Sequence, residues 1–408
     1  MQQLGWIHFS PSFKDKINSI LDLLDQEEGM VDELGLGPIR DAYADLFFPG
    51  TSTVQTRAKY FFIVPYLIKD FFLQKGGKSK NLEQFLNEEE HKIIWELADR
   101  YGHDRNAGSG VIGITKRKNQ MLARRPSSIY WNGLRSYNFI DTSLSLSEYY
   151  VNANKLLEEL LIVKKSIKDD SSDDQDIEYT DNHQVKVSTY QKGWREVLDL
   201  PLSYEEADFF HKRIIEIFPQ RLIGKIVSIP KLRDSFLNTS DFESFAKLCL
   251  QENIGDELKK QITQAHDLNE ITKGLHFAYS HLINARHYTN DVFLAQFNVW
   301  QKDLYANLID LNSLTSEAIH FSTGIDNNSV LAFIQSILTL IKRHQSGISD
   351  FSELIINQEI RIKGKKARLR IGAQRDFDQG KSKSLSHLNY RDGNTRTIIR
   401  DIFTALNQ

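Results

Sequence analysis

Apolar residues recur at intervals of three and four along most of this chain, and this spacing constrains its fold more than any other feature. Because an α-helix turns once every 3.6 residues, such intervals gather apolar side chains on one face. The pattern is cleanest over 329–344, whose apolar stripe consists of Val330, Phe333, Ile334, Ile337, Leu338 and Ile341. Related patterns predict further helices at 11–28, 39–48, 57–72, 82–100, 203–218, 240–265, 267–286 and 290–309. The expected fold is therefore mainly α, with many helices.

Two short segments depart from this helical spacing. Residues 184–190 and 359–371 alternate apolar and polar side chains, which is the two-residue rhythm of a strand. We therefore expect a small β contribution near 184–190 and 359–371. Ser203 and Glu206 form a capping-box pattern, which predicts that a helix begins there. No fixed period repeats along the chain, so a solenoid is not expected.

The sharpest change in composition is the segment 168–181, which holds seven carboxylates and one lysine. A segment with so few apolar side chains cannot form a core, which indicates an acidic linker or long loop. An acidic strip that competes with nucleic acid for a basic groove of the same molecule is the alternative interpretation. We expect an N-terminal helical domain at 1–165, a linker at 166–183, and a C-terminal, mainly helical domain at 184–408 with a basic, β-containing tail region.

Composition excludes several classes of protein. A chain of 408 residues with 40% hydrophobic residues can build a core without disulfide or metal staples. Its one cysteine, Cys249, excludes an intrachain disulfide and favours a reducing compartment. No cationic leader with a long apolar run and no stretch of 18 apolar residues occurs. We expect a cytoplasmic protein without a signal peptide or membrane span, whose net charge of −3 leaves attraction to nucleic acid to local patches.

A tight turn at 49–53, PGTST, precedes the helix expected at 57–72, and its hydroxyl side chains can cap that helix. Successive amides in front of a helix can bind an anion, and Arg57 can hold a phosphate or carboxylate there. In the structural alternative, Asp41 or Asp45 forms an ion pair with Arg57. The candidate residues for anion binding or for this structural role are Arg40, Asp41, Thr51, Ser52, Thr53, Gln55 and Arg57.

The segment 116–135 carries six cationic side chains and no acidic one. Cationic side chains attract phosphates, and the rings of Tyr130 and Trp131 can stack on unpaired bases. Pro126 indicates the start of a short helix, which suits the second element of a helix-turn-helix. The alternative is an ordinary core helix with a solvated basic flank, because Tyr130, Trp131 and Leu134 have the spacing of a buried face. The candidate contacts to nucleic acid are Lys116, Arg117, Lys118, Arg124, Arg125, Tyr130, Trp131 and Arg135.

The segment 361–400 is the second basic stretch, with twelve Lys or Arg against three Asp. A ribbon with one cationic face suits a phosphate backbone. An edge strand protected from aggregation by lysines, or a solvated tail, would have a similar sequence. The candidate contacts are Arg361, Lys363, Lys365, Lys366, Arg368 and Arg370, followed by Lys381, Lys383, Arg391, Arg396 and Arg400.

No motif for catalysis, metal binding or nucleotide binding is complete. His266, His276, His281 and His287 lack the mutual four-residue spacing that puts two zinc ligands on one helix face. The run GGKS at 76–79 lacks the earlier glycine of a phosphate loop. We therefore expect no cofactor and no metal, and the sequence assigns no catalytic residue.

Three blocks of sequence are similar to a family of uncharacterised bacterial proteins: GWIHFS at 5–10, ELGLGPIRDAYADLFFPGTSTVQTRAKYFFIVPYL at 33–67 and RRPSSIYWNGLR at 124–135. That family shares a GWIxFS opening and an IRDAxADLFFPGTSTxQTRAxYF block. The resemblance covers roughly the first third of the chain. It implies a place among genes for helicases and phospholipase D-type nucleases in phage-defence loci, and it carries no residue-level role.

Together these features favour a non-catalytic, nucleic-acid-associated component of a bacterial antiphage defence or DNA-processing complex. Its partners would be DNA or RNA, and a helicase or nuclease, with no membrane. One alternative is a scaffold or adaptor that holds the helicase or nuclease. A second is a metal-dependent nuclease or phosphohydrolase with an unrecognised site.

Overall fold

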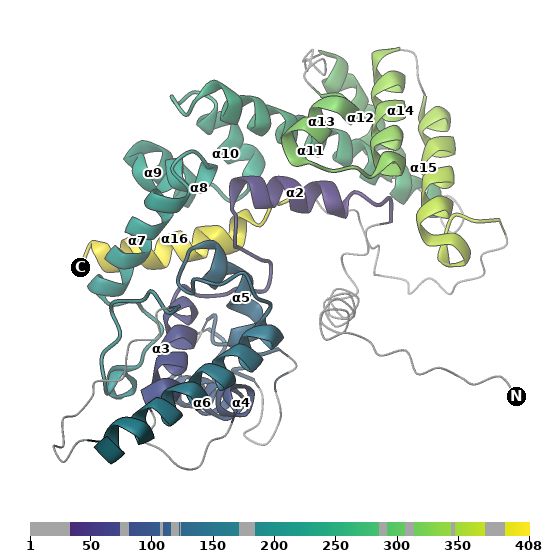
Figure 1. Ribbon diagram of the computed structural model, residues 1–408. Helices are drawn as coiled ribbons and strands as arrows, with labels where there is room; N and C mark the ends of the chain where they lie inside the picture. Colours follow the sequence, from purple (N-terminus) through teal and green to yellow (C-terminus); the bar gives the residue numbers. More distant parts are fainter. Residues whose placement is uncertain are drawn as a thin grey trace, which may run out of the picture. The chain divides into compact units, whose positions relative to one another are not determined.

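The computed structural model describes residues 33–73, 81–106, 109–115, 122, 124–170, 184–284, 292–306, 314–343, 347–371 and 388–408, with the backbone alone at 160–170 and 284. The protein is mainly helical (Figure 1), as its apolar spacing predicts. The described residues form two compact units. Unit 1 comprises Pro49–Pro219 and Gly393–Gln408, and unit 2 comprises 33–48 and Gln220–Asp392. The linker expected at 166–183 stays a prediction, since 171–183 lie outside the described residues.

Unit 1 is built around α3 (Tyr60–Leu73), which is apolar on nearly all sides and buried over most of its length. A helix that is apolar all round belongs inside a core. It packs against α4 (Leu82–Arg100) and α5 (Pro126–Ser136). The remaining elements of unit 1 are α6 (Leu146–Asp170), the short 3-10 helix η1 (Trp194–Val197), α7 (Tyr204–Ile217) and nearly all of α16 (Asp392–Leu406).

Aromatic rings fill the space between α3 and α7. The ring centroids of Phe61 and Phe210 lie 4.8 Å apart, and those of Phe139 and Phe210 lie 5.0 Å apart with an interplanar angle of 76°. Edge-to-face pairs of this kind stabilise a core beyond their burial alone. At the start of α7, the capping box between Ser203 and Glu206 is confirmed: each side chain accepts a hydrogen bond from the other residue's backbone N–H.

The helix expected at 57–72 begins later than the hydroxyl residues suggested. Residues 51–59 form turns and loop, and α3 starts at Tyr60. The side chain of Gln55 explains the delay, because its Oε1 accepts the N–H of Ser52 and its Nε2 donates to the carbonyl of Gly50. These bonds occupy backbone groups that a helix would use, so they favour a compact loop.

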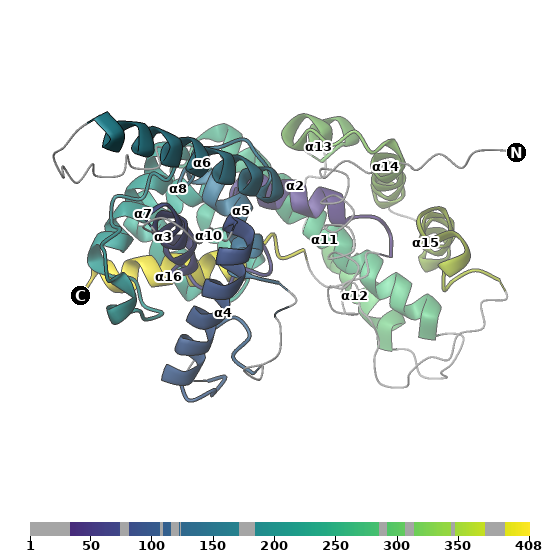
Figure 2. The same cartoon turned by 60° about the horizontal axis from the view of Figure 1, so that its bottom comes forward.

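Unit 2 is centred on α11 (Asp256–Asn284), a long helix that contacts α10 (Phe242–Cys249), α12 (Val292–Ala306) and α15 (Ile348–Lys363). Figures 1 and 2 both show α12 beside α11. The stripe expected over 329–344 is confirmed in α14 (Asn328–Lys342), where all six of its apolar residues are buried. The other elements are α2 (Gly37–Phe47), α8 (Leu222–Ser228), α9 (Pro230–Asn238), α13 (Ser316–Thr323) and the 3-10 helix η3 (Gly364–Lys366).

The strand expected at 359–371 is wrong, because α15 continues to Lys363 and η3 follows it. The first residues of that segment continue α15, in which the buried residues Phe351, Ile355 and Glu359 are four residues apart, and this longer helical pattern outweighs the local alternation. Gly364 ends the helix with φ +53°. Of the segment 184–190, only Val185 pairs in β fashion, through one isolated antiparallel bridge to Ile140.

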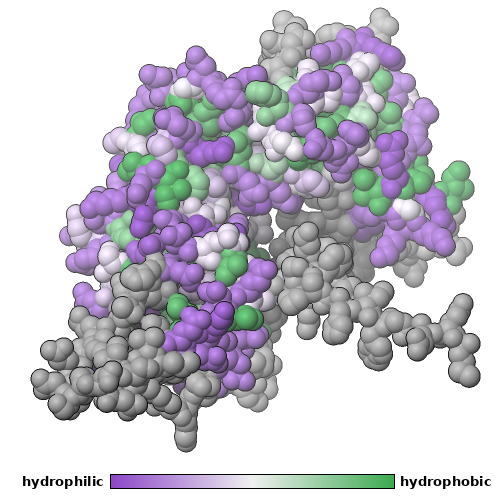
Figure 3. Space-filling model, in the orientation of Figure 1, coloured by the Kyte–Doolittle hydropathy of each residue, from purple (hydrophilic) through white to green (hydrophobic). Residues whose placement is uncertain are grey.

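The face drawn in Figure 3 is largely hydrophilic, with hydrophobic residues in small groups. Among the helices that the structure describes, none combines the length and apolar composition needed to cross a bilayer.

Replacement of Gly133 by alanine tests the tightest packing in unit 1. A Cβ there would lie 2.6 Å from the carbonyl oxygen of Gly50 and 2.7 Å from a ring carbon of Phe61. Overpacking of this kind costs roughly 1–3 kcal/mol, so Gly133→Ala should lower the free energy of unfolding by at least that much in chemical denaturation. Gly393→Ala is the matched control, because nothing lies within 4 Å of its Cβ position. Equal stability of the two variants would contradict the packing.

Candidate functional site

Two of the sequence blocks that support the resemblance meet in unit 1. Gly50, in the PGTST turn, adopts φ +75°, and a Cβ there would lie 2.7 Å from the Cβ of Ser136 and 3.2 Å from the Cα of Gly133. Only glycine combines this left-handed conformation with such close backbone approach. The turn is thereby held against α5.

The hydroxyl of Tyr130 fixes the loop that follows. It accepts the N–H groups of Thr56 and Arg57 at 2.8 and 3.0 Å and donates to the carbonyl of Arg57 at 2.9 Å. Burial raises the pKa of Tyr130 to about 12, so this hydroxyl keeps its proton. Because Tyr130 is fully buried and Trp131 is only 6% exposed, neither ring is accessible to a nucleic-acid base.

Arg57 is committed to Asp401 of α16. Its Nε lies 2.9 Å from Oδ2 and its Nη2 lies 2.9 Å from Oδ1, while Asp401 also accepts the N–H of Ala58. Its Nη1 donates to the carbonyl of Ser109. A bidentate arginine–carboxylate pair is a strong, directional contact. Arg57 thus forms an ion pair within unit 1, but its partner is Asp401 and not the expected Asp41 or Asp45.

The other candidates around that turn have mixed roles. In unit 2, Asp41 and Asp45 pair with Arg391, and Arg40 pairs with Asp41 at 3.1 Å. In unit 1, Asn394 donates to the carbonyls of Thr53 and Gln55. Thr51 is buried, and the Ser52 hydroxyl is buried without a hydrogen-bond partner among the described residues.

The basic segment 116–135 is described only in part, since 116–118 lie outside the described residues. The helix expected from Pro126 is confirmed as α5. Trp131 donates its Nε1 proton to the carbonyl of Leu144, and Arg135 donates to the carbonyl of Thr142. Arg124 and Arg125 precede the helix and are partly exposed.

A buried carboxyl group lies at the start of α5. Glu90 of α4 is fully buried and accepts both the N–H of Ser127, at 2.5 Å, and its hydroxyl, at 3.0 Å. Burial raises the pKa of Glu90 to about 7, although the two bonds from Ser127 and the charge of Arg125 oppose that shift. Glu90 therefore titrates near neutral pH.

A cluster of exposed cations lies in unit 2. We call it the basic turn: residues 361–370, which comprise the end of α15, η3 and the four residues after it. The carboxylate of buried Glu359 holds this turn, because it accepts the N–H groups of Arg368 and Leu369 and the hydroxyl of Tyr279. A carboxylate that accepts several such bonds fixes the backbone around it.

The cations of the basic turn divide into two groups. Lys363 and Arg368 face the buried carboxylate of Glu33, at 2.7 and 3.8 Å. The other four are exposed and form no ion pair within the described part of the chain, and only one, Arg361, has a polar contact, a long one to the Ser329 hydroxyl. These four are Arg361, Lys365, Lys366 and Arg370.

The later candidates of that basic stretch do not add to this cluster in the described residues. Lys381 and Lys383 lie outside them. Arg391 pairs with the two α2 aspartates, and Arg396 is buried. Arg400 is exposed on α16, in unit 1.

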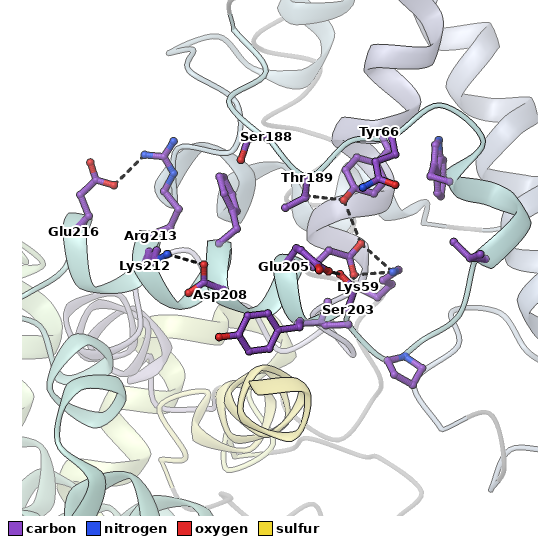
Figure 4. Close-up of a pocket in the computed structure, with 18 residues that line it drawn as sticks. Lys59, Tyr66, Ser188, Thr189, Ser203, Glu205, Asp208, Lys212, Arg213 and Glu216 are labelled. Carbon is purple, nitrogen blue, oxygen red and sulfur yellow. Dashed lines mark hydrogen bonds and ion pairs between the residues drawn. The ribbon is translucent and has the colours of Figure 1, made fainter. Parts of the chain in front are cut away.

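A pocket of about 880 Å³ lies in unit 1, between α3, residues 188–203 and α7 (Figure 4). Sequence patterns gave no indication of it. At its base, the Lys59 ammonium contacts both carboxylate oxygens of Glu206, at 2.9 and 2.7 Å. The hydroxyl of Tyr66 donates to Glu206 and contacts the hydroxyl of Thr189.

Several charged side chains of this pocket form ion pairs with one another. At the rim, Lys212 pairs with Asp208 and Arg213 pairs with Glu216, as the dashed lines in Figure 4 show. Burial, and then the Glu206 carboxylate, raise the pKa of Tyr66, so this phenol is no general base. The pocket therefore combines mixed polarity with charged side chains that pair within it.

Residues 1–161 match the model of a family of unknown function, DUF6361. The matched part contains all three sequence blocks that support the resemblance. No curated protein and no solved structure matches the chain.

Glu90→Gln tests the buried carboxyl. Because the folded pKa of Glu90, about 7, exceeds the ordinary glutamate pKa of 4.5, protonation of Glu90 stabilises the fold at low pH, and this contribution is lost as pH rises through about 7. Between pH 5 and 8 the wild-type free energy of unfolding should fall by about 2–3 kcal/mol more than that of Glu90→Gln. Denaturation across this range measures the difference.

The control is the exposed Glu96→Gln on the same helix, which should retain the wild-type pH dependence. A Glu90→Gln profile parallel to wild type would show that Glu90 does not titrate in this window.

Proposed function

We propose that this protein is a non-catalytic, nucleic-acid-associated component of a bacterial antiphage defence or DNA-processing complex. Its contact with the phosphate backbone is the basic turn. In this proposal the protein partner is a helicase or nuclease. The resemblance supports this choice, because it implies neighbouring genes for such enzymes.

The four exposed cations of the basic turn carry the proposal. Other described cations of the two basic stretches, such as Lys363 and Arg391, are neutralised by carboxylates of the chain. Exposed cations without such partners can release counterions from a phosphate backbone. The backbone of the turn is held by Glu359, so the side chains project from a fixed support. This arrangement favours binding to phosphates without sequence preference.

Salt dependence and a charge-matched pair of variants test this proposal. If all four cations contact duplex phosphates, the slope of log K against log salt should be about −3 to −4. Lys365→Gln/Lys366→Gln should reduce that slope by about 2, because each neutralised phosphate contact contributes about 0.9. Fluorescence anisotropy with labelled duplex and single-stranded DNA at several salt concentrations measures both quantities.

The control removes the same charge elsewhere in unit 2. Lys342→Gln/Arg343→Gln, at the exposed C-terminal end of α14, should leave the slope near its wild-type value. Absence of binding in low salt, or equal effects of the two double variants, would remove the basic turn from the proposed function.

A scaffold role is the second candidate function, and two aliphatic side chains at the start of the basic turn favour it. Ile360 and Ile362 are 36% and 39% exposed, so the surface mixes aliphatic and cationic groups. Interface centres are enriched in apolar side chains and arginine. Tagged protein from native cells should then retain a helicase or nuclease after nuclease digestion of the extract, and Ile362→Ser should release it. Loss of the partner on digestion alone would favour the nucleic-acid role.

A further inference from the structure

A histidine and two glutamates converge in unit 2, away from the basic turn in sequence. Glu243 of α10 and His266 and Glu270 of α11 each place one potential ligand atom within 4.8 Å of the other two. His266 and Glu270 are four residues apart, so the helix puts them on one face. Packing of α10 against α11 supplies the third group.

The hydrogen bonding of His266 identifies its available nitrogen. Nδ1 lies 3.2 Å from Oδ1 of Asp267, and a carboxylate can only accept, so Nδ1 carries the proton. In the neutral ring Nε2 then presents a lone pair. Nε2 is buried and has no hydrogen-bond partner in the described part of the chain. A histidine oriented by a carboxylate on one nitrogen, with its other nitrogen available, is the usual arrangement of a metal ligand.

The two glutamates already require a positive charge. Lys273, one turn beyond Glu270, pairs with Glu270 at 2.5 Å and also with Glu243, which in turn pairs with Lys247 at 3.1 Å. The two glutamates thus converge on one positive charge, a position that suits a metal cation.

A cavity between α11 and α12 borders one member of the cluster, Glu270. This cavity, of about 280 Å³, is lined by Glu270 and Lys273 together with Gln296, Trp300 and Asp303. An ion can reach Glu270 through it.

We propose that Glu243, His266 and Glu270 form a binding site for a divalent transition-metal ion, with Zn²⁺ as the representative ion. Imidazole nitrogen and carboxylate oxygen together suit zinc, whereas magnesium and calcium prefer oxygen ligands alone. Zinc bonds of roughly 2.0–2.2 Å require the three groups to move inward from their 4.8 Å limit, which rotation of the glutamate side chains achieves. The bound ion cross-links α10 to α11. This site is independent of the proposed nucleic-acid role.

The test uses the full chain after removal of metal by a chelator and dialysis. Titration with zinc chloride against a chromophoric chelator should show one zinc site that depends on His266, with Mg²⁺ at least 100-fold weaker. His266→Ala should lower zinc affinity by at least the roughly 10–100-fold that loss of an outer-shell partner costs, and Asp267→Asn should lower it within that range. His320→Asn is the control, because His320 lies in unit 2 beside one carboxylate, that of Asp326, at 3.0 Å.

Lys273→Met distinguishes a metal site from a structural ion pair. Removal of the competing ammonium should raise zinc affinity about tenfold or more. A purely structural role predicts lower stability without zinc and no gain in affinity, and circular dichroism of each variant confirms folding. The proposal is overturned if neither wild type nor Lys273→Met binds zinc, or if His266→Ala binds it as tightly as His320→Asn.

Discussion

The close approach of two glycine backbones is the constraint on which unit 1 depends. A Cβ on Gly133 would clash with the carbonyl oxygen of Gly50, and one on Gly50 would clash with Ser136 of the same helix, so the turn at Gly50 packs directly against α5. This places the backbone of Thr56 and Arg57 on the Tyr130 hydroxyl. With the loop fixed there, the Arg57 guanidinium meets Asp401 of α16. One packing contact thus sets the position of a helix more than 340 residues later in the chain.

In unit 2, the buried carboxylate of Glu359 fixes the backbone of the basic turn. Glu359 accepts bonds from two successive backbone amides and a tyrosine hydroxyl, so its desolvation is offset by three donors. Because Glu33 draws Lys363 and Arg368 inward, only part of the positive charge stays at the surface. Local net charge therefore overstates what a phosphate backbone can contact. The exposed cations of the basic turn are therefore fewer than the surplus of positive residues in the sequence suggests.

Local signals in the sequence predict local structure well. The α14 stripe, the capping box of Ser203 and the start of α5 at Pro126 each depend on neighbours within one or two turns. The start of α3 could not be predicted in this way, because Gln55 uses its side chain to hold a loop. The strand expected at 359–371 failed because its first residues continue α15, and a short alternation does not reveal the helical spacing of the buried residues before it.

Charge partners lie beyond such patterns. Nothing in the sequence near Arg57 indicates Asp401, and nothing near Lys363 indicates Glu33, because these pairs form only when distant segments pack. The same limit applies to His266. It does not belong to a pair of histidines, because the residue four positions later is Glu270 and the third group comes from α10.

In unit 2, an ammonium group and a divalent ion can each offset the repulsion between two neighbouring carboxylates. Two carboxylates held close together at the α10–α11 contact repel each other unless a cation lies between them. Lys273 supplies one charge from its own helix, at the cost of ordering a long side chain. In this arrangement Nε2 of His266 has no hydrogen-bond partner among the described residues, because the Lys273 ammonium is directed to the two carboxylates. A metal ion would neutralise both carboxylates and bind that nitrogen, so it satisfies one buried group more than lysine does.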